Sequence, residues 1–269
     1  MKSQLPKDKT KQMSEHRIGI STLERYTGSD AKQFQPYVLL TNFPKYLQIF
    51  ADKFNADIHQ GSAMSACHSA ENKLTIIDYG IGSPVAALII DLLSFTKPKA
   101  VLSLGLCGGL RGDEQKVGDY FNPVAAIREE GTSFAYLPER CPSLSSFVIQ
   151  RYVCEELERN RLKYHTGVIH TTNVRFWEFN ESFKQDLIIE RAQAIDMECA
   201  TLFTAGFSRL VPIGALMLIS DLPLETGGIK TKESASKLFN KYSDLQIQIG
   251  INILKNMQSN EAKGFAYHF

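Results

Sequence analysis

Short apolar runs alternate with segments that carry apolar residues at helical spacing along most of the chain. Runs of this length between turn residues indicate buried strands, and a 3.6-residue spacing indicates helices that bury one face. The predicted strands are residues 36–41, 74–77, 100–104, 120–127, 164–170, 194–195 and 213–219. The predicted helices are residues 46–54, 85–95, 145–160, 183–191, a segment from about 198 to 207, and 234–257. This alternation is typical of an α/β domain with a largely parallel central sheet.

The sequence has no repeat, low-complexity segment or linker, so one domain is the simplest organisation. Residues 1–30 are predicted to be a flexible N-terminal tail, and residues 31–269 a single domain. The first 17 residues are polar and lack the apolar core of a signal peptide. No apolar run reaches the ~18 residues of a membrane span, so we expect a cytoplasmic protein.

Composition and charge narrow the class of partner. Hydrophobic residues make up 43% and charged residues 22% of the 269, close to globular averages. The net charge of +1 gives no electrostatic argument for a nucleic acid or a membrane as partner. Five cysteines without a C-x-x-C pair exclude a zinc ribbon and a thioredoxin motif. We therefore expect a small-molecule substrate, and neither a metal nor a cofactor.

Ligands of open α/β sheets bind beyond the carboxyl ends of the strands, so the residues that follow each predicted strand are candidates. Residues 105–109 read Gly-Leu-Cys-Gly-Gly. Glycines there let the backbone approach a ligand and expose N–H groups. The pattern is neither G-x-G-x-x-G nor a P-loop, and an ordinary tight turn is an equal alternative.

Carboxylates follow two other predicted strands. Asp196 and Glu198 open a helix, where Asp196 can cap the helix and Glu198 can bind a vicinal diol. Asp221 follows the most apolar strand, where partial burial would let it hold a proton near neutral pH and act as a general acid. The alternatives are an ordinary helix start and a turn initiator.

A fourth candidate segment, residues 171–177, contains the only tryptophan. Phe176 and Trp177 could stack on a flat base, and Arg175 could meet an anion. Packing of the same side chains into the protein interior is the alternative.

Taken in order, these segments resemble the superfamily of nucleoside phosphorylases and nucleosidases. The matching pieces are residues 80–84, 105–109, 117–119, 128–133, 196–198 and 220–223. With their flanking strands and helices they extend from about residue 36 to about 253. Within the superfamily, the chain most resembles the short bacterial AMP nucleosidases, through residues 40–43, 107–111, 171–178, 229–233 and 245–254.

The resemblance implies a three-layer αβα sandwich with a mixed, largely parallel sheet, assembled as a homo-oligomer built from dimers, up to a hexamer. It also implies roles for single residues. Glu198 would bind the ribose hydroxyls, with Met197 packed on the sugar, and Asp221 would protonate N7 of the leaving purine. Candidates for the base site are Cys107, Gly108 and one aromatic ring, Phe176 or Trp177.

Two departures from the family pattern bear on the nucleophile. Phosphorylases bind phosphate through an Arg and a Ser or Thr where this chain has Ser103 and Leu106, which favours water. Methylthioadenosine nucleosidases activate that water with a Glu in the loop after the first strand, but residues 41–45 contain no acid. The candidate ligands for a 5′-phosphate are Lys45, Arg111, Arg128 and Arg175.

These features favour an AMP nucleosidase, which hydrolyses AMP to adenine and ribose 5-phosphate. The alternatives are a purine or uridine nucleoside phosphorylase, or another nucleosidase of the same superfamily. A third possibility, from a different class, is a nucleotide-binding protein without catalysis. The presence of both Asp221 and Glu198 argues against it.

Overall fold

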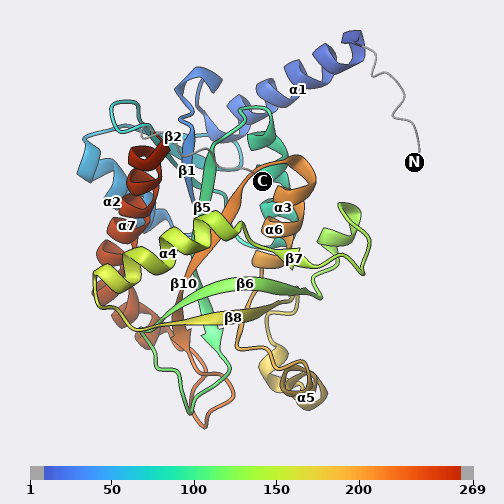
Figure 1. Ribbon diagram of the computed structural model, residues 1–269, viewed down its shortest axis with the longest axis vertical. Helices are drawn as coiled ribbons and strands as arrows, with labels where there is room; N and C mark the ends of the chain where they lie inside the picture. The colour runs from blue at the N-terminus through green and yellow to red at the C-terminus, as the bar shows by residue number, and fades with distance from the viewer. Residues whose placement is uncertain (1–8, 262–269) are drawn as a thin grey trace.

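One mixed β-sheet forms the centre of the molecule, and helices cover both of its faces (Figure 1). The computed structural model describes residues 9–261, with side chains from residue 13 onward. The strands are β1 (Tyr37–Thr41), β2 (Ile58–Gln60), β3 (Ser65–Ser69), β4 (Leu74–Asp78), β5 (Ala100–Gly109), β6 (Tyr120–Arg128), β7 (Ser143–Leu144), β8 (Tyr164–Thr171), β9 (Ala194–Asp196) and β10 (Ile213–Asp221). The helices are α1 (Lys9–Thr27), α2 (Pro44–Phe54), α3 (Ser83–Ser94), α4 (Phe147–Arg159), α5 (Glu181–Ile189), α6 (Cys199–Arg209) and α7 (Lys232–Glu261).

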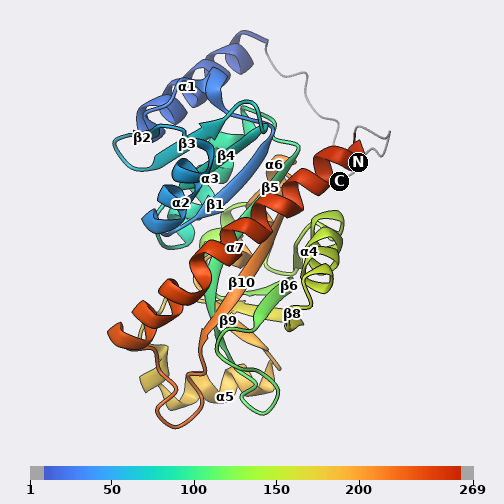
Figure 2. The same cartoon turned by 90° about the vertical axis from the view of Figure 1, so that its left-hand side faces the viewer.

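The helices form two layers with a separate apolar core on each face of the sheet. On one face, Leu23 of α1 and Phe203 of α6 are buried in a core shared with α3. On the other face, Phe50 of α2 and Leu254 of α7 are buried in a core shared with α4. Helix α7 contacts both α2 and α4 along its length (Figure 2). The predicted three-layer α/β fold is confirmed.

The sheet is open at one edge and curls back on itself at the other. Strands β4, β1, β5 and β10 run parallel to one another, and β2 and β3 extend this part by antiparallel pairing. Strands β6, β8 and β9 are parallel to one another, β6 pairs antiparallel with β10, and β9 pairs antiparallel with the end of β5. The curl brings the carboxyl end of β9 beside the carboxyl ends of β5 and β10.

The glycine segment is part of strand β5, which runs without a break from residue 100 to residue 109. The alternative interpretation of residues 105–109 as a tight turn is therefore wrong. A Cβ atom on Gly108 would lie 3.1 Å from both Ile195 in β9 and Pro223 after β10. Glycine is needed here because two other chain segments approach the strand closely.

The N-terminal prediction is also corrected. The flexible tail predicted for residues 1–30 is wrong for residues 9–27, which form helix α1. This helix contacts α3 and β3, and its Leu23 is fully buried. Its apolar pattern is weak because it buries only a narrow stripe of side chains, so little in the sequence indicates a helix here. Residues 1–8 lie outside the described part of the chain.

The edge strands β2 and β3 were not predicted, because their exposed and buried positions do not form a continuous apolar run. Within residues 9–261, none of the helices combines the length and apolarity needed to cross a bilayer.

Candidate active site

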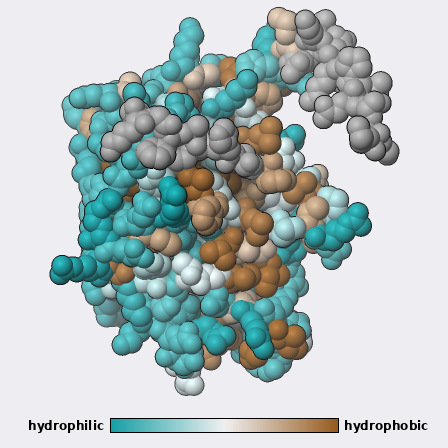
Figure 3. All heavy atoms as spheres, in the orientation of Figure 1, coloured by the Kyte–Doolittle hydropathy of each residue, from teal (hydrophilic) through white to brown (hydrophobic). Residues whose placement is uncertain are grey.

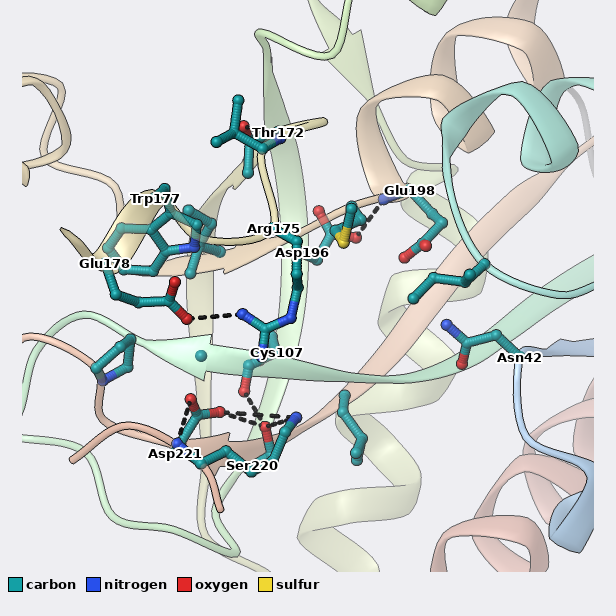
Figure 4. A pocket seen from close by; sticks show the side chains of 18 of the residues that line it. Asn42, Cys107, Thr172, Arg175, Trp177, Glu178, Asp196, Glu198, Ser220 and Asp221 are labelled. Carbon is teal, nitrogen blue, oxygen red and sulfur yellow. Dashed lines mark hydrogen bonds and ion pairs between the residues drawn. The ribbon is translucent and has the colours of Figure 1, made fainter. Parts of the chain in front are cut away.

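A cavity of about 190 Å³ lies where β1, β5, β9 and β10 end, and residues 172–178 after β8 form one of its walls (Figure 4). The chain folds this way because four strands end at the same place and the glycines of β5 leave room between them. The lining residues are Asn42, Phe43, Ile81, Leu106, Cys107, Gly108, Thr172, Val174, Arg175, Trp177, Glu178, Ile195, Asp196, Met197, Glu198, Ser220, Asp221, Pro223 and Lys230.

Asp221, the last residue of β10, is held at one end of the cavity by polar contacts from two residues. The Ser220 hydroxyl donates to Asp221 Oδ1 over 2.5 Å, and the Lys230 amide donates to Oδ2 over 3.4 Å. The Lys230 ammonium donates to Ser220 Oγ over 3.0 Å and lies 3.9 Å from Asp221 Oδ1. The carboxyl group is thus fixed in orientation and has a cation beside it.

Glu198 lies at another part of the cavity, at the beginning of helix α6. Asp196 satisfies the first amides of this helix, since its Oδ2 accepts from Cys199 N over 2.7 Å and from Glu198 N over 3.2 Å. Thr171 donates its hydroxyl to the other oxygen of Asp196 over 2.6 Å. Asp196 thus satisfies the first amide of α6, the role that the sequence predicted, but Glu198 and not Asp196 occupies the N-cap position. The Glu198 side chain is left to face the cavity.

The N-terminus of α3 also contributes to the Glu198 site. Gly82 has a φ of +101°, a left-handed conformation that favours glycine, and its amide donates to Glu198 Oε1 over 2.7 Å. The Ser83 hydroxyl donates to the carbonyl of Met197 over 2.7 Å. The segment of residues 80–84 thus positions both Met197 and Glu198.

The environment of Glu198 favours its protonated form. Burial, and secondarily the charge of Asp196, raise the pKa of Glu198 from 4.5 to about 8, against the opposing effect of backbone hydrogen bonds. Burial likewise raises the pKa of Asp196. The ion pairs among the described side chains include none to either carboxylate, so no basic side chain offsets this effect.

The aromatic segment after β8 contributes one of its two predicted rings. Trp177 is only 5% exposed, lines the cavity and packs against Phe183 with ring centroids 5.7 Å apart. Phe176 is 70% exposed and is not among the lining residues. Arg175 lines the cavity, and its Nη1 donates to Glu178 Oε1 over 2.7 Å.

Three of the four predicted cations do not reach the cavity. Lys45 Nζ donates to Phe239 O and Asn240 Oδ1 on helix α7. Arg128 donates to the Ser133 hydroxyl and to main-chain carbonyls of residues 137–141, so it holds that loop. Arg111 is not among the lining residues either. Of the four, only Arg175 lines the cavity.

Several lining residues have no counterpart among the predicted site residues, and two of them, Lys230 and Asn42, are polar groups of particular interest. Lys230 lies within residues 229–233, a segment noted only for its resemblance, and nothing in its spacing shows that it returns to Asp221. Asn42 directly follows β1, and its Oδ1 is buried without a hydrogen-bond partner. Asparagine is common in the turns that follow strands, so Asn42 carries no signal of its own in the sequence. Leu106, noted as a departure from the phosphate-binding pattern, lines the same cavity.

One cluster of metal-ligating residue types occurs among the described residues, away from the cavity. Glu129, His170 and Glu190 place one ligand atom each within 4.8 Å of one another. Each ring nitrogen of the fully buried His170 lies beside a different carboxylate, at 3.2 Å from Glu129 and 2.8 Å from Glu190. The His170 ring thus lies between the two carboxylates.

Comparison with known proteins agrees with this fold. Residues 36–254 match the Phosphorylase superfamily, and the chain belongs to this family. Its solved relatives include an AMP nucleosidase from Bacteroides thetaiotaomicron, with a TM-score of 0.81 and 38% identity over 92% of this chain and 99% of that one. A uridine phosphorylase from Vibrio fischeri, with a TM-score of 0.73 and 21% identity over 83% of this chain and 93% of that one, shares the fold.

Curated relatives carry two kinds of activity in their names. The AMP nucleosidase of Escherichia coli is 29% identical over 88% of this chain. This chain spans 58% of the length of that relative. A guanosine phosphorylase from Halorubrum lacusprofundi is 30% identical over 68% of this chain and 74% of its own length.

Proposed function

We propose that the protein hydrolyses the N-glycosidic bond of AMP to give adenine and ribose 5-phosphate. The observation that carries the proposal is the arrangement of one cavity. It combines the restrained acid Asp221, the buried Glu198 and the cation Arg175, with the apolar Leu106 where phosphorylases bind phosphate. The names of the relatives from Bacteroides thetaiotaomicron and Escherichia coli support the same substrate.

Asp221 acts on the leaving group. As the glycosidic bond breaks, its electron pair moves onto the purine, and a proton delivered by Asp221 to N7 makes the base a neutral leaving group. The Ser220 hydroxyl and the Lys230 amide fix the carboxyl orientation. The Lys230 ammonium then stabilises the carboxylate that remains after proton transfer.

Glu198 acts on the sugar. Its carboxylate accepts hydrogen bonds from the 2′ and 3′ hydroxyls and gains interaction as positive charge grows on the ribose. Met197 packs on the sugar beside it, and the Gly82 amide fixes the position of one Glu198 oxygen. The base lies between Trp177 and the strand residues Cys107 and Gly108.

Arg175 is the ligand that we propose for the 5′-phosphate. One of its terminal nitrogens is bonded to Glu178, which orients the guanidinium, and its remaining N–H donors are free to bind an anion. Guanidinium groups bind phosphate through paired hydrogen bonds, so the side chain suits a doubly charged 5′-phosphate.

The variant Arg175→Ala tests the substrate. Loss of hydrogen bonds to a charged group costs ~1.5–3 kcal/mol, so KM for AMP should rise about 10- to 150-fold. Cleavage of adenosine, which lacks the phosphate, should hardly change. Lys45→Ala is the matched control, since Lys45 contacts α7 instead, and its KM for AMP should stay at the wild-type value. Equal wild-type activity on adenosine and AMP would contradict the proposal.

A nucleoside phosphorylase is the second candidate, favoured by the similarity to the guanosine phosphorylase of Halorubrum lacusprofundi. Leu106 argues against it, because a leucine side chain cannot donate to phosphate. Incubation with nucleoside in the presence and absence of inorganic phosphate separates the two, since a phosphorylase is inactive without phosphate.

The homo-oligomer expected from the resemblance stays a prediction. Apolar side chains gather on the face that carries α4, β7 and α6 (Figure 3). Leu144, Phe147 and Phe207 are more than half exposed there, around a groove of about 520 Å³. Apolar surfaces of this kind are typical of protein contacts. Sedimentation of the wild-type protein measures the state of assembly.

A further inference from the structure

Asn42 occupies the part of the cavity away from Asp221. Figure 4 shows Asp221 and Ser220 at one end and Asn42 near Glu198 at the other. Asp221 marks the end that holds the leaving base. A nucleophile approaches C1′ from the face opposite the leaving group, so it must enter from the end where Asn42 lies.

The Asn42 amide has unused hydrogen-bonding capacity. Its Oδ1 is buried and without a hydrogen-bond partner, and the residue lines the cavity with its amide directed inward (Figure 4). Buried polar atoms are nearly always paired, so an unpaired oxygen on a residue that lines a cavity is available to a hydrogen-bond donor bound there. Its neighbours along the wall include the apolar side chains of Phe43, Ile81 and Leu106. These side chains can neither donate nor accept a hydrogen bond.

Glu198 lies at the same end of the cavity as Asn42 (Figure 4), but its carboxylate is committed to other contacts. One of its oxygens accepts the Gly82 amide, and the proposed function uses the carboxylate for the ribose hydroxyls. The loop after β1 contributes no acid to the cavity, and Lys45 is turned toward α7. Asn42 is thus the group in this loop that can accept a hydrogen bond from a water molecule.

We propose that Asn42 is the positioning residue for the nucleophilic water, an inference that rests on the proposed hydrolytic function. A water that donates one hydrogen to Oδ1 has a lone pair available toward C1′. An amide oxygen is too weak a base to take a proton. It need not, because an oxocarbenium-like sugar reacts with neutral water once that water is oriented.

In the proposed step, the bond between C1′ and the base breaks, its electron pair leaves with the purine, and Asp221 supplies the proton to N7. The bond between the water oxygen and C1′ forms, and the proton that water then loses passes to solvent. A proton from solvent returns Asp221 to its starting form. Asn42 accepts a hydrogen bond throughout and keeps its own composition.

The test compares Asn42→Ala and Asn42→Asp with wild type on AMP. A single neutral hydrogen bond is worth ~0.5–1.5 kcal/mol, so kcat of Asn42→Ala should fall about 2- to 13-fold with KM unchanged. Asn42→Asp keeps the acceptor and should restore kcat above the pH at which the introduced carboxyl ionises. Asn240→Ala, an exposed amide on α7, is the matched control and should match wild type.

Methanol provides a second readout that a purely structural role would not change. In dilute aqueous methanol, wild type should form mainly ribose 5-phosphate because its site selects water. In Asn42→Ala, the fraction of methyl riboside 5-phosphate should rise toward the proportion of methanol in the solvent. Circular dichroism of each variant shows whether the fold is intact, and Asn42→Asp keeps the test usable if the alanine variant does not fold.

Three results would overturn the inference. They are a kcat for a folded Asn42→Ala within 1.5-fold of wild type, a raised KM with kcat unchanged, and an unchanged product ratio in methanol. Failure of the proposed function looks different. In that case wild type itself releases no adenine from AMP in phosphate-free buffer, before any variant is compared.

Discussion

The two carboxylates of the cavity have opposite surroundings. Asp221 has a hydroxyl, a backbone amide and the ammonium group of Lys230 around it. Glu198 is buried, is bonded to backbone amides and lies beside a second buried carboxylate, Asp196. Its burial, and then the charge of Asp196, raise its pKa to about 8. The same functional group is thus placed once beside a cation and once beside an anion.

This difference gives each carboxylate a different role in the proposed reaction. The cation beside Asp221 compensates the negative charge that appears when its proton is given to the base. The anion beside Glu198 favours its protonated form in the empty site, and the ionised form is stabilised only as positive charge develops on the sugar. Both groups are therefore better matched to the transition state than to the empty site, which is the condition for catalysis.

The largest effect is expected from Asp221→Asn, which keeps shape and hydrogen bonding but cannot deliver a proton. Loss of a general acid costs ~10²–10⁴ in rate, so kcat should fall at least 100-fold while substrate binding is largely kept. Single-turnover release of adenine measures it, with Asp186→Asn on the exposed face of α5 as control. If Asp221→Asn keeps activity within a few-fold of wild type, Asp221 is not the general acid.

Glu198→Gln is expected to lower kcat/KM by about 10- to 150-fold, because hydrogen bonds to a charged group are worth ~1.5–3 kcal/mol. The ratio of activity on AMP to activity on 2′-deoxy-AMP should also fall, since the diol contact is weakened. An unchanged ratio would refute the diol role. Glu181→Gln, an exposed change on α5, is the control.

The pH dependence of kcat/KM provides a separate test of the role of Glu198. The ionised form of Glu198 is the one that accepts both hydroxyls, and its pKa in the free enzyme is raised to about 8. kcat/KM reports ionisations of the free enzyme. For wild type, it should therefore rise with pH up to about 8. That limb should be absent in Glu198→Gln.

The smallest effect is expected from Lys230→Met, which removes the cation from the Asp221 end. We expect kcat to fall about 10-fold, equivalent to ~1.4 kcal/mol, with Lys230→Arg closer to wild type. Discrimination against 2′-deoxy-AMP should stay unchanged, because Glu198 is not touched. Lys232→Met, two residues along and exposed, is the control. A changed deoxy ratio would show that the two ends are not independent.

Local pattern predicted most of the elements but not all of the contacts. A continuous apolar run predicts strand β10, and apolar residues at helical spacing predict helix α2, so the positions of both follow from the sequence. Helix α1 and the strands β2 and β3 bury too little for a clear pattern. Strand β5 continues through residues 105–109, which include three glycines, because it pairs with β9 and β10 there. This pairing joins residues far apart in the sequence, so local pattern does not predict it.

The same limit applies to the cavity. Asp221, Glu198 and Met197 follow strand ends, so the fold class alone brings them together. Arg128 and Lys45 also lie near strand ends, but carbonyl groups of a loop and of α7 hold their side chains elsewhere. The sequence shows that a side chain is basic, but not which acceptor it contacts in the folded protein. Lys230 reaches Asp221 through a turn whose path no periodicity encodes.

The burial of Glu198, together with the charge of Asp196, also makes the folding equilibrium depend on pH. Since the folded chain binds a proton at Glu198 up to about pH 8, whereas an unfolded glutamate releases it near 4.5, the folded state holds the extra proton between these values. The free energy of unfolding must therefore decrease as the pH rises through this window, and above it the difference stays constant. Above this window, the protein without substrate is less stable because Glu198 is ionised in a buried site. A bound sugar that donates hydrogen bonds to Glu198 raises the free energy of unfolding again.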